Sequence, residues 1–100
     1  MKLKITPTPD VINVVLSGSL NTQAAQEIEP KITELETLAS KPITIDCTDL
    51  QYIASTGLRL LLRLRKAAFT HGQTITLSSV NDNVMEVLHI TNFDKMFNIV

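Results

Sequence analysis

Two adjacent hydroxyl side chains, Ser55 and Thr56, are the residues of this sequence best suited to chemistry. They follow a β-branched segment and precede Gly57 and a leucine-rich stretch, a pattern that predicts a strand passing into a helix. In an open α/β sheet, ligands bind beyond the carboxyl ends of the strands, where such a junction lies. One hydroxyl, expected to be that of Thr56, can cap the helix, which is worth roughly 1 kcal/mol. The other can carry a phosphate, because a helix N-terminus favours negative charge.

The residues after the hydroxyls allow two interpretations as well. Gly57 fits either a sharp turn or close packing on the sheet, and the turn is its expected role. A line of polar residues along the expected helix is either its solvated face or a surface for an acidic partner, with Arg59 nearest to a phosphate on Ser55. That line comprises Arg59, Arg63, Lys66 and Thr70. Phosphorylation would add nearly two negative charges, which suffices to repel a docked protein.

Enzyme chemistry is not supported by the remaining reactive side chains. Ser55 with His71 or His89 and Asp49 would make a hydrolase triad on paper, but the Gly-x-Ser-x-Gly elbow is absent. Neither histidine has another ligand at metal-binding spacing, and no glycine-rich nucleotide loop occurs. The single cysteine, Cys47, lies in an apolar strand pattern and is expected to be buried. We therefore expect no enzyme activity, no catalytic residue, no metal and no cofactor.

Length and composition restrict the class of protein. The chain has 100 residues, 44% of them hydrophobic, and a formal net charge of −1. We expect one domain over residues 1–100, since a second core would not fit. No apolar run reaches the ~20 residues that span a bilayer and no leader pattern is present, which predicts a cytoplasmic protein without direct membrane insertion. Without a basic tail or many aromatic residues, nucleic acid is not an expected partner.

Hydrophobic periodicity predicts the elements that position the hydroxyls. The expected strands cover residues 2–6, 11–16, 43–49 and 74–77, and the expected helices cover residues 21–40, 56–69 and 82–90, with a short closing element to residue 100. Asn21 or Thr22 is the expected cap of the first helix, and Asn81 or Asp82 that of the third. The order ββαβαβα predicts an α/β fold: a single small domain with a mixed, mostly parallel sheet of four to five strands and about three helices.

Three local features sharpen this prediction. The Thr6–Asp10 segment contains two prolines and predicts a hairpin between the first two strands. The continuous apolar run Val11–Leu16 predicts a strand buried on both faces. Because there are only three helices, we expect them to lie mostly on one face of the sheet. Pro30 inside the first helical pattern predicts a kink or a late helix start, and Gly72 predicts a left-handed end to the second helix.

The junction resembles a known family. Asp46, Leu50 and Ile53 with Ser55-Thr56-Gly57-Leu58 are similar to the corresponding motif of the STAS domain, a family that includes bacterial anti-sigma-factor antagonists. The segment Leu16–Asn21 resembles the family's turn before the first helix, and the resemblance extends over most of the chain. Two positions depart from the family pattern, because Ala54 and Asn21 stand where aspartates are usual, which lowers the local negative charge.

The resemblance implies a phosphorylation-controlled protein-binding module. Its partner would be an anti-sigma factor that is also a serine kinase of the histidine-kinase-like ATPase fold, bound when the antagonist is unphosphorylated. Phosphorylation at Ser55, with Thr56 as a secondary acceptor, would release it, and a PP2C-type phosphatase would reverse the step. The alternative is a non-phosphorylated STAS scaffold or transporter-associated subunit. The implied partner-binding residues are Asn21, Thr22, Asp49, Ala54, Ser55, Thr56, Gly57 and Arg59.

Overall fold

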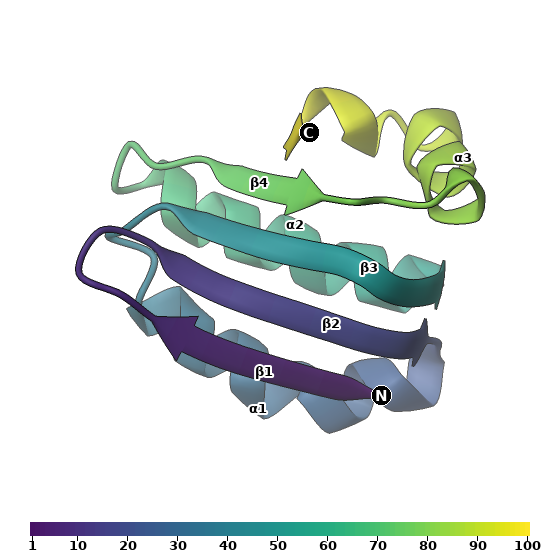
Figure 1. The fold of residues 1–100 in the computed structure, drawn as a ribbon, viewed down its shortest axis with the longest axis horizontal. Helices are drawn as coiled ribbons and strands as arrows, with labels where there is room; N and C mark the ends of the chain where they lie inside the picture. Colours follow the sequence, from purple (N-terminus) through teal and green to yellow (C-terminus); the bar gives the residue numbers. More distant parts are fainter.

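The computed structural model describes residues 1–100 as a five-stranded sheet with three α-helices (Figure 1). The elements in chain order are β1 (Lys2–Pro7), β2 (Ile12–Leu20), α1 (Thr22–Thr37), β3 (Ile43–Ile53), α2 (Ser55–Phe69), β4 (Ile75–Ser78), α3 (Asp82–Ile90), the 3₁₀ turn η1 (Phe93–Lys95) and β5 (Asn98–Ile99). The strands lie side by side in sequence order, β1-β2-β3-β4-β5. The predicted order and fold class are therefore confirmed, with β5 as the closing element.

The sheet is mixed, as predicted. Strands β1 and β2 form an antiparallel hairpin, whereas β2-β3, β3-β4 and β4-β5 are parallel pairs. Each parallel pair is joined through a helix, since parallel neighbours require a crossover connection. All three helices consequently begin beyond the carboxyl ends of the strands that precede them.

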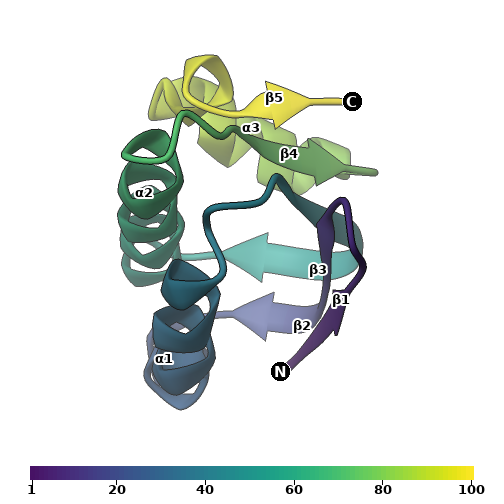
Figure 2. The ribbon, with the colours of Figure 1, turned by 90° about the vertical axis from the view of Figure 1, so that its left-hand side faces the viewer.

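Helices α1 and α2 cover one face of the sheet and leave the opposite face open (Figure 2). This arrangement explains the burial pattern of β2, in which Ile12, Val14 and Leu16 are buried while Val15 is exposed. The expectation that this strand is buried on both faces is wrong. Its continuous apolar run includes a valine that points to the open face, and no helix packs there.

The core is one cluster of 25 buried hydrophobic residues between the sheet and the helices, with no buried polar or charged residue. Cys47 belongs to it and is 2% exposed, in agreement with the prediction of a buried thiol. Burial raises the pKa of this thiol to about 12, because the thiolate would lose its hydration. Cys47 is therefore protonated and inert at neutral pH.

Strand β3 is longer than the sequence predicts. The segment after Asp49, expected to be a loop, continues as strand to Ile53. Its pairing with β2 shifts register between Val15 and Ser17 and again between Gly18 and Ser19. Each shift leaves an extra residue in β3, and such bulges break the alternation of buried and exposed side chains that identifies a strand.

Helix α1 runs from Thr22 to Thr37 without a break at Pro30. The expectations of a late start and of an end at Ser40 are therefore wrong. Pro30 is exposed, so water can reach the backbone carbonyl that the proline leaves without an amide donor. Asn21 is the cap, since its side-chain oxygen accepts from the Ala24 amide at 2.8 Å.

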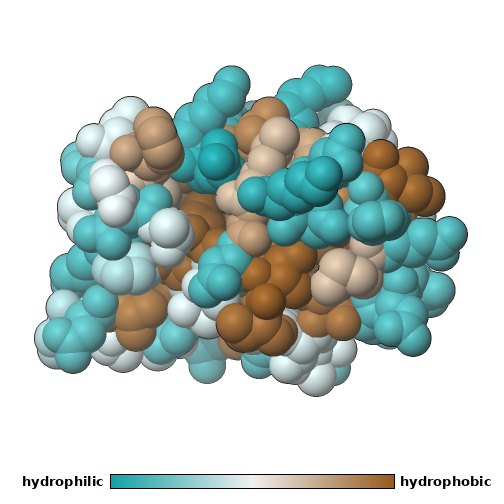
Figure 3. Space-filling view, turned by 90° about the horizontal axis from the view of Figure 1, so that it is seen from above, coloured by the Kyte–Doolittle hydropathy of each residue, from teal (hydrophilic) through white to brown (hydrophobic).

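The carboxyl-terminal part of the chain packs beside β4. Asn81 caps α3, and Gly72 adopts a positive φ of 69° after α2, as predicted. Figure 3, which looks onto the α3 side, shows apolar side chains gathered among polar ones in the middle of this face. Two apolar side chains of the helices, Phe69 and Ile90, are 70% and 71% exposed. None of the helices combines the length and apolar character needed to cross a membrane.

Candidate functional site

The starts of α1 and α2 are joined at one end of the sheet. Leu20 ends β2 and pairs in register with Ile53, which ends β3. The backbone amide of Ala54 donates to the carbonyl of Leu20 at 2.9 Å, and this bond fixes the two helix starts next to each other. Asn21 and Ser55, which follow the two strands, are consequently neighbours across this end of the sheet.

The N-terminus of α2 has no side-chain cap. Ala54 occupies the cap position, and the first intrahelical bond runs from the Leu58 amide to the Ala54 carbonyl at 3.0 Å. The prediction that Ser55 or Thr56 caps the helix is therefore wrong, because both hydroxyls lie inside the first turn. The three amides that precede Leu58 have no intrahelical acceptor. The exposed Ser55 side chain lies at the first helical position, beside these donors.

Gly57 serves close packing, and the expectation that it serves the turn is wrong. It is buried, and a Cβ atom on it would lie 2.6 Å from Cγ and 2.8 Å from Cδ2 of Leu20, with Ile53 Cγ1 at 3.1 Å. Its φ is not positive, so the turn does not require glycine. The glycine brings α2 against the ends of β2 and β3. It lies in the core and offers no surface to a partner.

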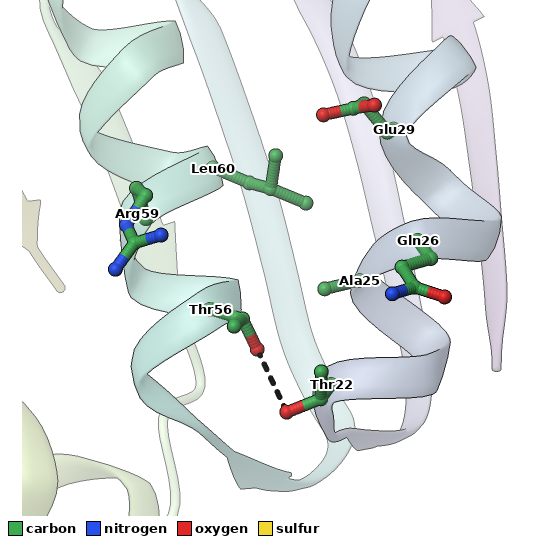
Figure 4. A pocket seen from close by; sticks show the side chains of 7 residues that line it. All are labelled: Thr22, Ala25, Gln26, Glu29, Thr56, Arg59 and Leu60. Atoms are coloured by element: carbon green, nitrogen blue, oxygen red, sulfur yellow. Dashed lines mark hydrogen bonds between the residues drawn. The ribbon is translucent and has the colours of Figure 1, made fainter.

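Thr56 faces α1 rather than the end of its own helix. Its hydroxyl donates to Thr22 Oγ1 at 3.4 Å, across the gap between the two helices (Figure 4). Above this bond is a shallow, open pocket of about 170 Å³. The pocket is lined from α1 and α2 by Thr22, Ala25, Gln26, Glu29, Thr56, Arg59 and Leu60.

Arg63 is a cross-helix contact that the sequence did not identify. Its guanidinium lies 3.3 Å from Glu29 and 3.0 Å from Glu36, and it also donates to Thr33 Oγ1 at 3.0 Å. These three partners all belong to α1. The predicted polar line on α2 is therefore not uniform, because Arg63 is committed within the molecule while Arg59 forms no ion pair. A pairing between residues about thirty positions apart leaves no local signal in the sequence.

The structure brings most of the predicted partner-binding residues together. Thr22, Thr56 and Arg59 line the pocket, while Asn21 and Ser55 are exposed at the adjoining helix starts. Asp49 is separate from this group. It is exposed within β3, pairs with Ser17 and does not line the pocket.

The aspartate of the sequence motif acts locally in β3. Asp46 Oδ1 accepts from the hydroxyl of Thr48 at 2.6 Å and from its amide at 3.0 Å. These two hydrogen bonds stabilise the carboxylate and lower the pKa of Asp46. The carboxylate is thus engaged at the first β3 bulge rather than at the helix start.

The chemistry available at the site is that of hydroxyls, amides and one guanidinium. No group of three or more histidine, cysteine, aspartate or glutamate side chains is arranged to hold a metal ion. His71 is exposed at the end of α2, and His89 pairs with Asp94 at 3.0 Å near the carboxyl terminus. Neither histidine lines the pocket with Thr56. Such a site can bind a protein surface or carry a phosphate.

Comparisons with known proteins agree with this geometry. The family model described as STAS domain matches residues 2–100. BtrV of Bordetella bronchiseptica, provisionally named an anti-sigma factor antagonist, is 26% identical over 97 residues, which cover 97% of this chain and 84% of BtrV. A Thermotoga maritima protein with the same provisional description has a crystal structure of TM-score 0.85 at 24% identity, covering 97% of this chain and 84% of that chain.

A further structural relative is known in two covalent states. SpoIIAA, an anti-sigma factor antagonist and Bacillus cell fate determinant, has been solved unphosphorylated and phosphorylated. The unphosphorylated form matches with TM-score 0.82 at 17% identity, over 99% of this chain and 88% of SpoIIAA. The phosphorylated form matches with TM-score 0.73 at 16% identity, over 99% and 91%. At these identities the structural matches establish a shared fold.

Proposed function

The chain belongs to the STAS domain family, and from this membership we propose that it is an anti-sigma factor antagonist controlled by phosphorylation of Ser55. In its unphosphorylated form it binds and sequesters an anti-sigma factor that is also a serine kinase of the histidine-kinase-like ATPase fold. Phosphorylation by that kinase dissociates the complex, and a PP2C-type phosphatase restores the unphosphorylated form that binds. The chain is then a cytoplasmic substrate of these enzymes and has no catalytic role of its own.

The exposure of Ser55 at the first position of an uncapped helix carries this proposal. A kinase can reach the hydroxyl, and the helix amides that lack intrahelical acceptors can donate to phosphate oxygens. Thr56 is a poorer acceptor, since its hydroxyl is half-buried and already bonded to Thr22. Ser55 is therefore the primary acceptor and Thr56 the secondary one.

Phosphate would act on the partner rather than on the fold. A helix N-terminus favours a dianion, so the modification does not unfold α2. The same two charges lie on the surface where Asn21, Thr22 and Arg59 are also accessible. A docked protein must then accommodate or desolvate a phosphate at its interface, which weakens the complex.

The direct test is incubation of the chain with ATP and the kinase-like ATPases of its source genome. We expect one of them to add a single phosphate, located on Ser55 by mass spectrometry of tryptic peptides. Ser55→Ala should remove the modification, and Ser55→Asp should weaken binding of the same kinase at least about tenfold. Thr56→Val is the matched control and should keep most of the modification.

The alternative predicts a different pattern. A constitutive STAS scaffold or transporter-associated subunit is favoured by Ala54 and Asn21, which replace the family's two aspartates. Such a protein would take no phosphate at Ser55 or Thr56, and its complex would be indifferent to Ser55→Asp. Its co-purified partner would be a nucleotide-binding ATPase of a transporter. That combination would overturn the phosphoswitch.

A further inference from the structure

A single line of side chains runs outward along α2 from the proposed phosphorylation site. Ser55, Arg59, Leu62, Lys66 and Phe69 follow one another at i, i+4, i+7, i+11 and i+14, so they share one face of the helix. The leucines that enter the core occupy the opposite side. Apolar residues on an outward face leave a surface that is not purely a solvated stripe.

The basic side chains of α2 are not equally free. The helix contains three arginines, one lysine and no acidic residue. Arg63 is compensated by two glutamates of α1, and Arg65 donates to the Met96 carbonyl at 2.7 Å and lies 6.0 Å from the ring centroid of Phe69. Arg59 and Lys66 are exposed and in no ion pair. The two cations of α2 that form neither an ion pair nor a side-chain hydrogen bond are thus both on the outward line.

A groove between α1 and α2 accompanies this line. The pocket of about 170 Å³ beside Thr56 shares Glu29, Arg59 and Leu60 with a second hollow of about 220 Å³. The second hollow extends along α2 to Leu62 and Lys66. Figure 4 shows Arg59 and Leu60 on α2 and Glu29 on α1 at the end of the first pocket away from the Thr22–Thr56 bond. The candidate site is therefore continuous with a longer surface along the helix.

We propose that this α2 surface, made of Arg59, Leu62, Lys66 and Phe69, docks an acidic amphipathic helical segment of the partner protein. The inference rests on the proposed function and assigns the chemistry of the partner's face. Alternating cationic and apolar side chains at heptad-like spacing match a helix that presents acidic and apolar residues in the same alternation. Phe69, 70% exposed, and the half-buried Leu62 are the apolar anchors.

The charge at the start of the line agrees with an acidic partner. Ala54 and Asn21 place no carboxylate at the two helix starts, and Glu29, the carboxylate that lines the groove, is paired with Arg63. Phosphorylation would reverse this condition. A phosphate on Ser55 would lie one helical turn from Arg59, where it compensates that cation and repels the acidic segment. The docking surface and the switch would consequently work through the same electrostatic contact.

Charge reversal on the line tests the proposal with the kinase that recognises Ser55. In Arg59→Glu/Lys66→Glu the two free cations become acids. Binding measured by calorimetry should weaken at least about tenfold, and its dependence on salt concentration should flatten. Lys4→Glu/Lys31→Glu makes the same change of charge at two exposed lysines near β1 and should alter binding less than about twofold. Circular dichroism would verify that each variant folds.

The outcomes separate this inference from the proposed function. If Ser55→Asp weakens binding while the two double variants behave alike, the acidic-segment proposal is wrong and the phosphoswitch stands. If no kinase binds the unmodified chain, the phosphoswitch is wrong, and a synthetic helical peptide with glutamate and leucine at this spacing tests the surface alone. Saturable amide NMR shifts confined to α2 and its groove, which disappear when glutamine replaces glutamate in the peptide, would support the proposed docking surface. Shifts elsewhere, or none, would overturn it.

Discussion

The three helices begin with the same backbone geometry but with different chemistry. The cap residues Asn21, Ala54 and Asn81 all have extended conformations, with φ between −92° and −76° and ψ within about 12° of 180°. The asparagines of α1 and α3 each accept from the amide three residues on, at 2.8 Å. Ala54 offers no acceptor to α2. The difference therefore lies in the side chain alone.

This comparison shows that α2 is positioned by packing and that α1 and α3 are also held by their caps. Six residues of α2 are buried, including Leu58 and Leu64, and Gly57 fits against Leu20 without space for a Cβ atom. A helix anchored in this way does not depend on the roughly 1 kcal/mol that a cap supplies. Its first amides stay available to a ligand, and Ser55 is the side chain next to them.

The largest expected effect comes from breaking the packing of α2. Gly57→Val should destabilise the protein by about 3 kcal/mol, because the new side chain overlaps Leu20, which is fully buried and cannot move aside. The free energy of unfolding, obtained from urea denaturation, measures this. Gly57→Ala should lie between the wild type and the valine variant. Equal stability of all three proteins would show that α2 is not held by close packing at its start.

Removal of the asparagine caps should have the next largest effect, and the two caps should differ. Asn81→Ala should cost about 2 kcal/mol, since Asn81 also donates to the Leu50 carbonyl at 2.8 Å and the variant loses both bonds. Asn21→Ala loses only the bond to Ala24 and should cost about 1 kcal/mol. The same denaturation experiment compares them. An equal loss in both variants would contradict the role of the Leu50 contact.

The sequence narrowed each of these caps to two adjacent residues, Asn21 or Thr22 and Asn81 or Asp82, because the signal of a cap is local. Asn21 and Asn81 precede apolar helical patterns, and a capping bond spans only three residues. The alternating strand Ile43–Cys47 and the hairpin were recognisable for the same reason, as was the left-handed Gly72. The order of these local signals was sufficient to predict the parallel sheet.

The features that the sequence did not predict depend on contacts between distant residues. The continuation of β3 to Ile53 depends on bulges opposite β2, which remove the alternating pattern. The commitment of Arg63 to α1 depends on how two helices pack. The prediction that Thr56 is the cap was wrong because the sequence pattern, a hydroxyl residue before an apolar helix, is the same whether that residue is the N-cap or lies one or two positions inside the helix. Only the backbone angles place Ala54 at the cap.

Installing the missing cap should sharpen the comparison in the opposite direction. Ala54→Asp gives α2 an acceptor for its free amides and should stabilise the unmodified protein by about 1 kcal/mol. The new carboxylate would also compete with a phosphate for the same donors. We therefore expect phosphorylation of Ser55 to raise the melting temperature of the wild type and to raise that of Ala54→Asp less. A stabilisation by phosphate that is equal in both proteins would mean that the helix amides do not bind it.

The smallest expected effect concerns Asp46. Its carboxylate accepts from a backbone amide, whereas no side chain accepts from the first amides of α2. Its pKa is lowered in the folded protein by the Thr48 hydroxyl and amide, so its contribution to stability is present above the unfolded pKa of about 4 and is lost as the pH falls through the lower folded value. Thr48→Val removes the hydroxyl and keeps the amide. Because Thr48 is exposed, the variant should lose less than about 0.5 kcal/mol at pH 7, and this difference should shrink below pH 4.

Urea denaturation at pH 7 and pH 3 measures this difference in the free energy of unfolding. Thr44→Val, on the same strand and without a carboxylate contact, is the control. A difference from wild type that stays constant with pH would assign the loss to the strand itself. A difference confined to higher pH would show that a carboxylate hydrogen-bonded to a nearby amide and hydroxyl stabilises this fold measurably even at its surface. Because Ala54 supplies no such acceptor, the first amides of α2 remain available to a phosphate.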